Sequence, residues 1–569
     1  MKGRKGQDLG LRQSMSWLHG WSGLLLGWLL FAIFFTGTIA YFRQEVTAWM
    51  QPETAASRPS PQAAELAIAK LAAVAPDAAS WRISLPNDRS NTLGISWRKA
   101  QPETRARGGN GRGERGGEGN RNRGRRGGGR DRGESLTLDA TTGATITPRE
   151  TAGGTFLYRF HFELYALPRE WARWIVGIAT MAMFVAIISG VITHKKIFKD
   201  FFTFRPAKGQ RSWLDAHNAT AVLALPFHLM ITYSGLLLFA STLLPWAGDM
   251  AFGEDPRASR AEARAAQARE VEALQARLAD AAGTDPAMAP IAPMLARAER
   301  IWGQPASRIT ITDPGKPGAL VEVLPTRNDS LAQHSGSGGL GAVKLRFAGA
   351  TGALIDEQRD APGSAIATID TALGSLHRAR FAPPGLRWLF FLAGVGGTVM
   401  VGSGLVLWSV KRAEKRKGAP GHFGHKLVDH LNVGAVAGLC IATAGYFWAN
   451  RLLPARLDDR GEWEIACFLA IWLASFVHPL LRPLRAAWLE QLTAAGALFA
   501  ALPVLNLMTS HAHLGVTVPA GNWMVAGFDL VALATGLALL AAAAKLRRRI
   551  ARAASKPPVA THAARLAAE

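Results

Sequence analysis

The sequence has little cysteine and few acidic residues. Its 569 residues include two cysteines, Cys440 and Cys467, and both lie inside apolar runs. No disulfide framework is therefore expected. Lysine and arginine together number 65 against 42 aspartates and glutamates, which gives a formal net charge of +23. Such a balance suggests nucleic acid or anionic lipid as a partner.

Several motifs of nucleotide and metal sites are also missing. The chain has no Gly-x-Gly-x-x-Gly between a strand and a helix and no Walker Gly-Lys-Ser/Thr, so it carries no recognisable nicotinamide, flavin or ATP site. His-Glu-x-x-His is absent as well. No cleavable signal peptide is evident, and the first apolar run, 17–42, is long enough to be a retained membrane anchor.

Long apolar runs dominate the chain. Eight of them reach about 18 residues or more with few internal charges, which is enough to cross the hydrocarbon of a bilayer. Many of the 18 tryptophans lie near the ends of these runs, as is typical of interfacial belts. We therefore expect an all-α membrane core of about eight transmembrane helices. These are 17–42, 172–194, 213–244, 386–410, 428–450, 463–481, 486–509 and 523–544.

Basic residues in the short flanks predict the orientation of these helices. Clusters precede the first helix, lie between the second and third, follow the fourth, separate the sixth and seventh, and follow the eighth. Eight spans that begin inside place all five clusters on the cytoplasmic side, in agreement with the positive-inside rule. Both termini are therefore expected to be cytoplasmic, and membrane lipid is an expected partner.

Two long segments then lie outside, and each reads as a small α+β domain. In 43–171 a helix near 65–71 is followed by strands near 81–85, 92–97 and 135–139 and by the turn Thr142-Gly143. The second segment, 245–385, contains a solvated helix at 256–282 and then repeats this order: a helix near 294–300, strands near 309–311, 320–323 and 344–347, and the turn Thr351-Gly352. This is a weak internal repeat.

A Gly/Arg-rich stretch, 105–133, interrupts the first outer segment and cannot pack a core. Its composition resembles an RNA-binding tail, but the topology places it outside. We interpret it as a disordered surface insertion, without a nucleic-acid partner. The expected organisation is 1–42 (tail and first helix), 43–171 (first outer domain), 172–244 (second and third helices), 245–385 (second outer domain), 386–410 (fourth helix), 411–427 (cytoplasmic loop), 428–544 (fifth to eighth helices) and 545–569 (basic tail).

Four histidines stand at the entrances of apolar runs. His19 opens a run that reaches Thr36-Gly37, and His217 opens one that reaches Ser234-Gly235, with 18 residues from histidine to glycine in both. His161 and His377 each precede a run by about a dozen residues. A histidine within or beside a membrane span is a functional hypothesis by default.

These residues carry a family resemblance. With Trp17-Leu18-His19-Gly20-Trp21, Phe160-His161-Phe162, Leu214-Asp215-Ala216-His217 and Leu376-His377, the chain resembles the PepSY-associated transmembrane family of iron-regulated bacterial inner-membrane proteins. That family includes haem-containing ferric-siderophore reductases. The resemblance covers roughly 15–410, and the Thr-Gly ends of the outer segments resemble PepSY domains. Helices five to eight and the Gly/Arg insertion depart from the pattern.

The resemblance implies two b-type haems in the bacterial inner membrane. By the predicted topology, His19 and His217 lie at the cytoplasmic ends of helices one and three, and His161 and His377 lie at the outer ends of helices two and four. Each pair is expected to hold one haem iron. His194 and His228 remain alternative ligands; His228 returns to the helix face of His217 roughly 16 Å deeper. Because Cys-x-x-Cys-His is absent, covalent c-type attachment is not expected.

The expected function is one-electron transfer to a ferric siderophore or another ferric chelate outside, with release of Fe(II). The donor is expected to be a quinol or a cytoplasmic reductase. The sequence indicates no catalytic residue besides the haem ligands, and it leaves the chelate, the donor and the oligomeric state open. The alternative is a non-enzymatic PepSY membrane regulator of a peptidase, or an accessory of a siderophore or iron transporter.

Overall fold

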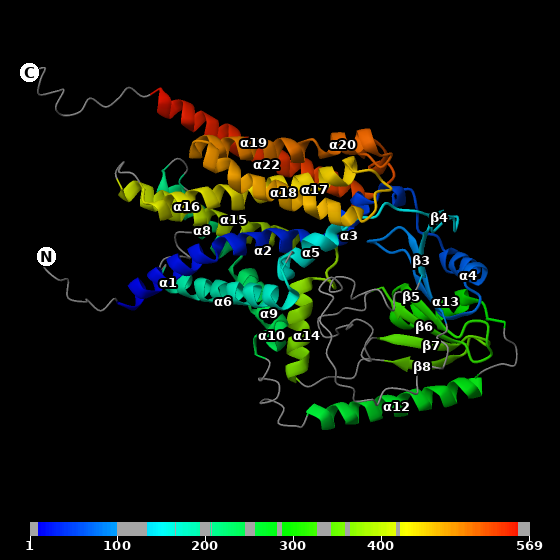
Figure 1. Ribbon diagram of the computed structural model, residues 1–569. Coiled ribbons are helices and arrows are strands. Elements are labelled where there is room, and N and C mark those ends of the chain that lie inside the picture. The colour runs from blue at the N-terminus through cyan, green and yellow to red at the C-terminus, as the bar shows by residue number, and fades with distance from the viewer. Residues whose placement is uncertain are drawn as a thin grey trace, which may run out of the picture. The chain divides into compact units, whose positions relative to one another are not determined.

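The protein is described by a computed structural model for residues 10–99, 134–165, 167–193, 205, 208–244, 256–281, 287–326, 343–358, 365–416 and 421–555. The chain divides into two compact units (Figure 1). The helical unit comprises 1–52, 149–245 and 376–569, and the sheet unit comprises 53–148 and 246–375. The Gly/Arg insertion and His194 lie outside the described residues.

The helical unit holds the expected apolar helices. Six described helices are long and apolar enough to cross a membrane, and the number is eight if each of two bent pairs counts as one span. A multi-pass helical membrane core is therefore confirmed, with six to eight spans. The six are α6 (Arg169–Thr193), α15 (Pro384–Lys415), α18 (Arg460–Leu481), α22 (Trp523–Ala554), α16 (Phe423–Asn432) continued by α17 (Gly438–Leu452), and α19 (Leu484–Ala500) continued by α20 (Leu502–Thr509).

The two bent pairs break at equivalent places. Helices α1 (Leu11–Leu25) and α2 (Gly27–Ala40) meet at 66°, and α8 (Gln210–Leu223) and α9 (Leu225–Leu238) meet at 70°. Each break falls seven residues after the histidine that opens the run. In the second pair Pro226 explains the break, because proline lacks an N–H and disfavours helical geometry before it.

The first part of the helical unit is built from two equivalent sets of helices. One set is α1, α2, α5 (Gly153–Glu163) and α6, and the other is α8, α9, the end of α14 (Ala365–Arg378) and α15. Within the sets α1 contacts α6 and α8 contacts α15, and between them α6 contacts α9 and α2 contacts α15. The helices that carry His161 and His377 are thus separate from the spans that follow them.

The remaining helices pack on one another and on α3. A π-helical turn, Val433–Ala437, joins α16 to α17, and α17 packs on α18 while α19 packs on α22. Helix α3 (Arg43–Met50) contacts α5, α17 and α22.

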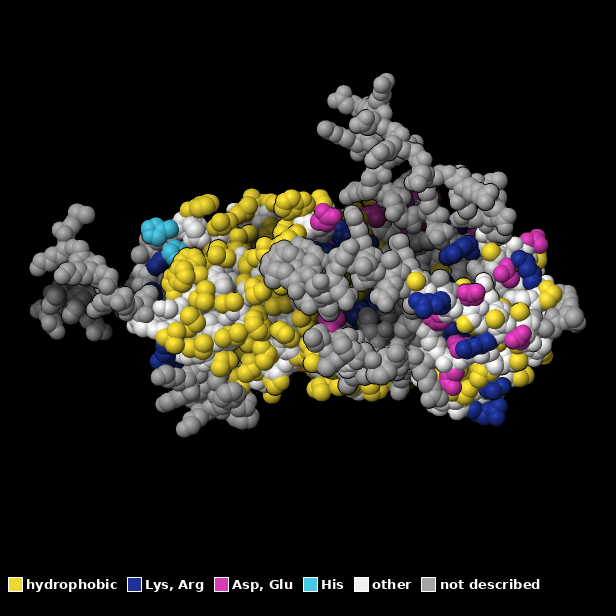
Figure 2. All heavy atoms as spheres, turned by 90° about the horizontal axis from the view of Figure 1, so that it is seen from below, with side chains coloured by type: hydrophobic (Ala, Val, Ile, Leu, Met, Phe, Trp, Pro, Cys, Tyr) yellow, Lys and Arg dark blue, Asp and Glu magenta, His cyan; other side chains and the backbone are white. Residues whose placement is uncertain are grey.

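One face of the molecule carries a broad field of hydrophobic side chains over the helices, with few charges among them (Figure 2). Large apolar side chains on α6 and α15 are exposed, among them Ile178, Leu389 and Leu392. Exposed apolar area of this extent is what a lipid-facing surface requires.

The sheet unit is one eight-stranded antiparallel sheet, where the sequence predicts two domains. Its strand order is β4-β3-β2-β1-β5-β6-β7-β8, so the two outer segments join where β1 pairs with β5. Pairing these two strands leaves neither of them as an exposed edge. The strands are β1 (Ala78–Ser84), β2 (Leu93–Lys99), β3 (Glu134–Leu138), β4 (Thr145–Ile146), β5 (Ala306–Thr312), β6 (Leu320–Pro325), β7 (Lys344–Ala348) and β8 (Leu354–Gln358).

The predicted helix-and-strand repeat is visible in this sheet. Helix α4 (Ala63–Val74) precedes β1 and α13 (Ile291–Trp302) precedes β5, and the two helices contact each other. They pack with the inward side chains of the strands in one hydrophobic core. Gly143 and Gly352 both have φ +69°, which explains why the two Thr-Gly turns need glycine. A further helix, α12 (Pro256–Ala281), contacts β8.

A charged cluster lies on the second half of this sheet. The Arg346 guanidinium is 7% exposed and bonds to the carboxylates of Glu322 at 3.1 Å and Asp356 at 2.9 Å. Burial raises the pKa of the Glu322 carboxyl, but Lys344 and Arg346 outweigh burial and hold that pKa below its ordinary value. The stabilisation from ionised Glu322 is thus present at neutral pH and is lost as the pH falls through the lowered pKa.

We expect Arg346→Met to destabilise the sheet unit by about 1–2 kcal/mol, because it removes the buried cation that the Glu322 and Asp356 carboxylates share. Lys344 at 2.9 Å from Glu322 and Arg277 at 3.0 Å from Asp356 remain as weaker, more exposed partners. The measurement is urea-dependent proteolysis of the full-length protein in detergent. Lys316→Met is the control, since Lys316 and its partner Asp313 are 67% and 44% exposed. That variant should change stability by less than about 0.5 kcal/mol. Equal effects of the two variants would contradict a buried cluster.

Candidate functional site

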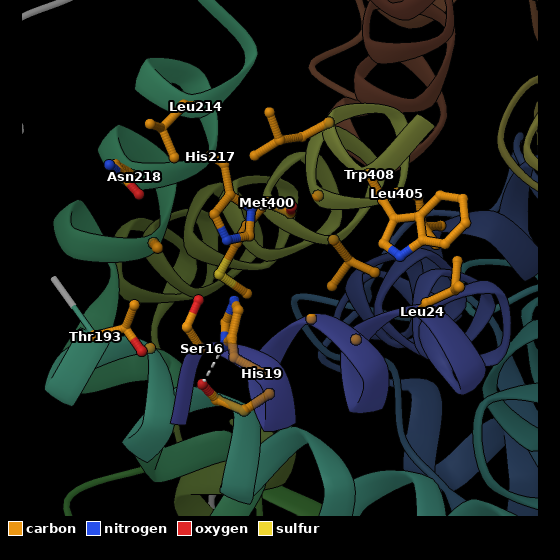
Figure 3. A pocket seen from close by; sticks show the side chains of 18 of the residues that line it. Ser16, His19, Leu24, Thr193, Leu214, His217, Asn218, Met400, Leu405 and Trp408 are labelled. Carbon is orange, nitrogen blue, oxygen red and sulfur yellow. Dashed lines mark hydrogen bonds between the residues drawn. The ribbon is translucent and has the colours of Figure 1, made fainter. Parts of the chain in front are cut away.

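The structure brings His19 and His217 together from the two sets of helices. Their ring centroids are 6.1 Å apart and their planes are inclined by 72°. Nδ1 of His19 lies 2.8 Å from the main-chain oxygen of Ala186 on α6, and Nδ1 of His217 lies 2.8 Å from that of Met400 on α15. Figure 3 shows His19 and His217 pointing toward each other, with Met400 beside them.

His161 and His377 form a second pair with the same construction. Their ring centroids are 6.2 Å apart, with planes inclined by 41°. Nδ1 of His161 lies 2.7 Å from the carbonyl oxygen of Ile33 on α2. Nδ1 of His377 lies 2.9 Å from the hydroxyl of Ser234 on α9, and that hydroxyl donates to the Met230 carbonyl at 2.6 Å. The pairing expected from the sequence is the one that the structure contains.

Each of the four imidazoles lies against a glycine of a neighbouring helix. A Cβ at Gly37 would come within 2.6 Å of the His161 ring, and a Cβ at the other three glycines would come within 3.1 to 3.2 Å of the facing ring. Each glycine follows a serine or threonine. The four combinations are His19 on Ser189-Gly190, His161 on Thr36-Gly37, His217 on Ser403-Gly404 and His377 on Ser234-Gly235.

The hydrogen bonds at Nδ1 determine what the rings can bind. A ring that donates its Nδ1 proton to a main-chain oxygen keeps the Nε2 lone pair free, which is the state of a neutral metal-ligating histidine. Two such nitrogens bound at about 2.0 Å on opposite sides of one metal put the ring centroids roughly 6 Å apart. Both observed separations, 6.1 Å and 6.2 Å, agree with this value.

A site with only two protein ligands suits a metal whose other ligands belong to a cofactor. Among the described residues there is no group of three or more His, Cys, Asp or Glu side chains placed to hold a metal ion. A transition-metal ion bound directly by protein side chains typically has three or four of them as ligands. Haem iron needs two axial ligands, since the macrocycle supplies the rest. The residues present therefore fit haem.

A cavity of about 550 Å³ adjoins the first pair. Its wall includes His19 and His217 and is mostly apolar, with Trp17, Leu30 and Met183 among the lining residues. Cofactor sites of this kind are typically apolar cavities of about 300–1,000 Å³ with a few polar groups that set orientation. The volume and the lining thus suit a large apolar ring.

His228, one of the two alternative ligands, lines the same cavity but does not face another histidine among the described ring contacts. It is 1% exposed, and neither ring nitrogen makes a hydrogen bond of ordinary geometry, although the carbonyls of Ala221 and Ala393 lie nearby. Its ring packs edge-on against Phe34, with centroids 6.1 Å apart. His228 therefore lines the cavity without a histidine facing it, and it stays an alternative ligand. The other alternative, His194, lies outside the described residues.

Contacts along α6 give the separation of the two pairs. Thr180 lies beside Gly235, the glycine under His377, and Gly190 lies under His19. Ten residues of α6 separate Thr180 from Gly190, which is roughly 15 Å at 1.5 Å per residue. The two pairs therefore lie at different depths of one bundle.

None of the four histidine–glycine contacts was predicted from the sequence. Gly37 and Gly235 stood out only because each follows a histidine, His19 or His217, by 18 residues, yet in the structure they contact His161 and His377. Ser189-Gly190 and Ser403-Gly404 lie in other apolar runs and carried no signal of their own.

A buried polar network in the later helices was also missed. The Asp529 carboxylate, fully buried, accepts hydrogen bonds from the Trp49 indole and the Asn506 amide, both at 2.8 Å. Arg451 donates to the Trp49 carbonyl at 2.6 Å and to the Asn506 side chain at 2.9 Å. These hydrogen bonds connect residues of four helices, so the network ties α3 to α17, α20 and α22.

The fold defines a multi-pass membrane protein whose helical unit contains two pairs of neighbouring histidines. The sequence profile described as "PepSY-associated TM region" matches residues 16–411, and the chain belongs to this family. An uncharacterized protein of Pseudomonas aeruginosa is 25% identical over 388 residues, which cover 65% of this chain and 89% of that protein. The expected family is confirmed, and helices α16 to α22 lie outside the matched residues.

We expect Gly37→Ala to lower thermal stability, because its Cβ would meet the His161 ring at 2.6 Å. Overpacking of this kind costs about 1–3 kcal/mol. Gly23→Ala is the control, since nothing lies within 4 Å of a Cβ at this position of α1. It should stabilise the helix by about 0.5–1 kcal/mol. Scanning fluorimetry in detergent measures both, and equal shifts would contradict the packing described.

Proposed function

We propose that this protein is a di-haem electron-transfer protein of the bacterial inner membrane that reduces ferric chelates on the outer side. One observation carries the proposal: four imidazoles, held by Nδ1, face each other in two pairs about 6 Å apart. Neither the family nor the relative names a cofactor, so the geometry of the pairs is the main support.

His19 and His217 would hold one haem b, and His161 and His377 would hold the other. When bound, each haem supplies one-electron exchange between Fe(III) and Fe(II) at a potential tuned by its ligands and burial. The chain orients the imidazoles through the Ala186, Met400 and Ile33 carbonyls and the Ser234 hydroxyl. The apolar cavity wall excludes water from the first site.

The positions of the pairs support transfer across the membrane. The pairs are separated by roughly 15 Å along α6. By the positive-inside rule, the end with His19 and His217 would be cytoplasmic, and there a quinol or a cytoplasmic reductase would donate the electron. His161 and His377 then lie toward the outside, where the acceptor arrives.

A ferric siderophore or similar ferric chelate is the proposed acceptor. Its Fe(III) takes up one electron and becomes Fe(II), and the chelator itself is unchanged. Hard oxygen ligands hold Fe(II) less tightly than Fe(III), so the iron is released. The sheet unit would position the chelate or a partner protein.

The haem count of histidine variants tests the cofactor. We expect two haems per chain in the wild type by pyridine haemochrome, and one in His19→Ala or in the double variant His19→Ala/His217→Ala. His19→Ala/His161→Ala should contain none, because it removes a ligand from each pair. His422→Ala, an exposed histidine outside both pairs, should keep two. Protein without haem from haem-replete cells would overturn the proposal and favour a non-enzymatic PepSY regulator or transporter accessory.

Reoxidation tests the acceptor. Protein reduced anaerobically with one equivalent of electrons per haem should be reoxidised by a ferric hydroxamate, with about one Fe(II) trapped by ferrozine per haem oxidised. The same chelator loaded with Ga(III), which cannot accept an electron under these conditions, should leave the reduced spectrum unchanged. A reduced protein that ferric chelates do not reoxidise would exclude chelate reduction while leaving haem binding intact.

A further inference from the structure

Helix α15 carries a polar stripe that begins beyond the glycine under His217. Trp408 and Arg412 follow Gly404 by one and two turns, roughly 6 and 12 Å along the helix. They line the same cavity as His19 and His217, together with Lys411 and Lys415. The cavity is otherwise mostly apolar, and its three cations, Lys411, Arg412 and Lys415, all lie near the C-terminal end of α15.

The donors in this stripe lack acceptors within the described part of the chain. The indole N–H of Trp408 is buried and makes no hydrogen bond there. The Arg412 guanidinium lies 3.5 Å above the centroid of the Trp408 ring, and no carboxylate is within salt-bridge distance of it among the described residues. Arg205, by contrast, is paired with the Asp215 carboxylate at 3.0 Å. A buried donor beside an uncompensated guanidinium calls for an anionic acceptor.

We propose that Trp408, Arg412, Lys411 and Lys415 form a carboxylate-binding site at the mouth of this cavity. The ligand is the pair of carboxylate groups on the tetrapyrrole that His19 and His217 would hold, so the inference rests on the proposed function. A planar guanidinium stacked on an indole is already oriented, and carboxylates are its preferred partners.

This site gives the ligand one orientation. The carboxylate edge would lie beside Arg412 and the exposed Lys411 and Lys415, and the apolar edge would lie against the buried Leu30, Met183 and His228. Iron ligation by two imidazoles alone does not distinguish between rotations of the ring about the iron. The cations on α15 make that distinction, and they also raise affinity at this pair alone.

A chemically matched pair of ligands tests the site. The full-length His161→Ala variant, which retains only the pair His19 and His217, is stripped of haem and titrated with haem or with haem dimethyl ester. The ester keeps the iron and the ring but has no negative carboxylates. We expect haem to bind on the order of tenfold more tightly than the ester.

Substitutions on α15 should reduce this preference. Arg412→Gln should reduce the preference for haem severalfold while the ester affinity stays the same, and Trp408→Phe should do so while keeping an aromatic ring for the guanidinium. Arg485→Gln and Lys426→Gln remove exposed cations outside the cavity and should leave the preference unchanged.

The outcomes separate this inference from the proposed function. Failure of the wild type to bind haem would overturn both. Equal affinity for haem and ester, or a preference that Arg412→Gln leaves unchanged, would overturn the carboxylate site and leave the proposed function standing. An anionic lipid headgroup is the other source of the missing anion. If Arg412→Gln weakens binding to phosphatidylglycerol nanodiscs without changing the preference for haem, the stripe binds lipid and the proposal fails.

Discussion

The helical unit depends on one repeated contact: an imidazole donates its Nδ1 proton to an oxygen of a neighbouring helix while its ring occupies the place of a glycine's missing side chain. A membrane interior offers no water, so a polar ring there needs a partner within the protein. Main-chain carbonyls accept a second hydrogen bond at little cost, and glycine lets the ring approach them closely. The contact thus fixes helix spacing, ring orientation and tautomer together.

The two sets of helices use this contact reciprocally. His19 on α1 packs on Gly190 of α6, and His161 on α5 packs on Gly37 of α2; the second set repeats the arrangement with His217 and His377. The facing partner of each histidine, however, comes from the other set. Each candidate metal site is therefore complete only when both sets are assembled, and a metal bound there would hold the two together.

The later helices are attached to this core by charge as well as by apolar packing. The Glu464 carboxylate accepts hydrogen bonds from the Thr151 hydroxyl at 2.7 Å and from the Asn450 amide at 2.7 Å, and Arg460 pairs with it at 2.5 Å. Arg460 and Glu464 are both fully buried. Buried charges are tolerated only when paired and hydrogen-bonded, so this network specifies one docking geometry between the segment before α5 and helices α17 and α18.

The sequence by itself determined the apolar runs, the four histidines at their ends, most strands of the sheet and both Thr-Gly turns, because apolar length, alternation and turn chemistry are local properties. It did not show that β1 pairs with β5 and unites two outer segments in one sheet. Nor did it show which glycine each histidine meets, since the hydrogen bonds at Nδ1 join residues 128 to 183 positions apart. Such contacts arise only when the helices have packed, and that packing decided which imidazoles face each other.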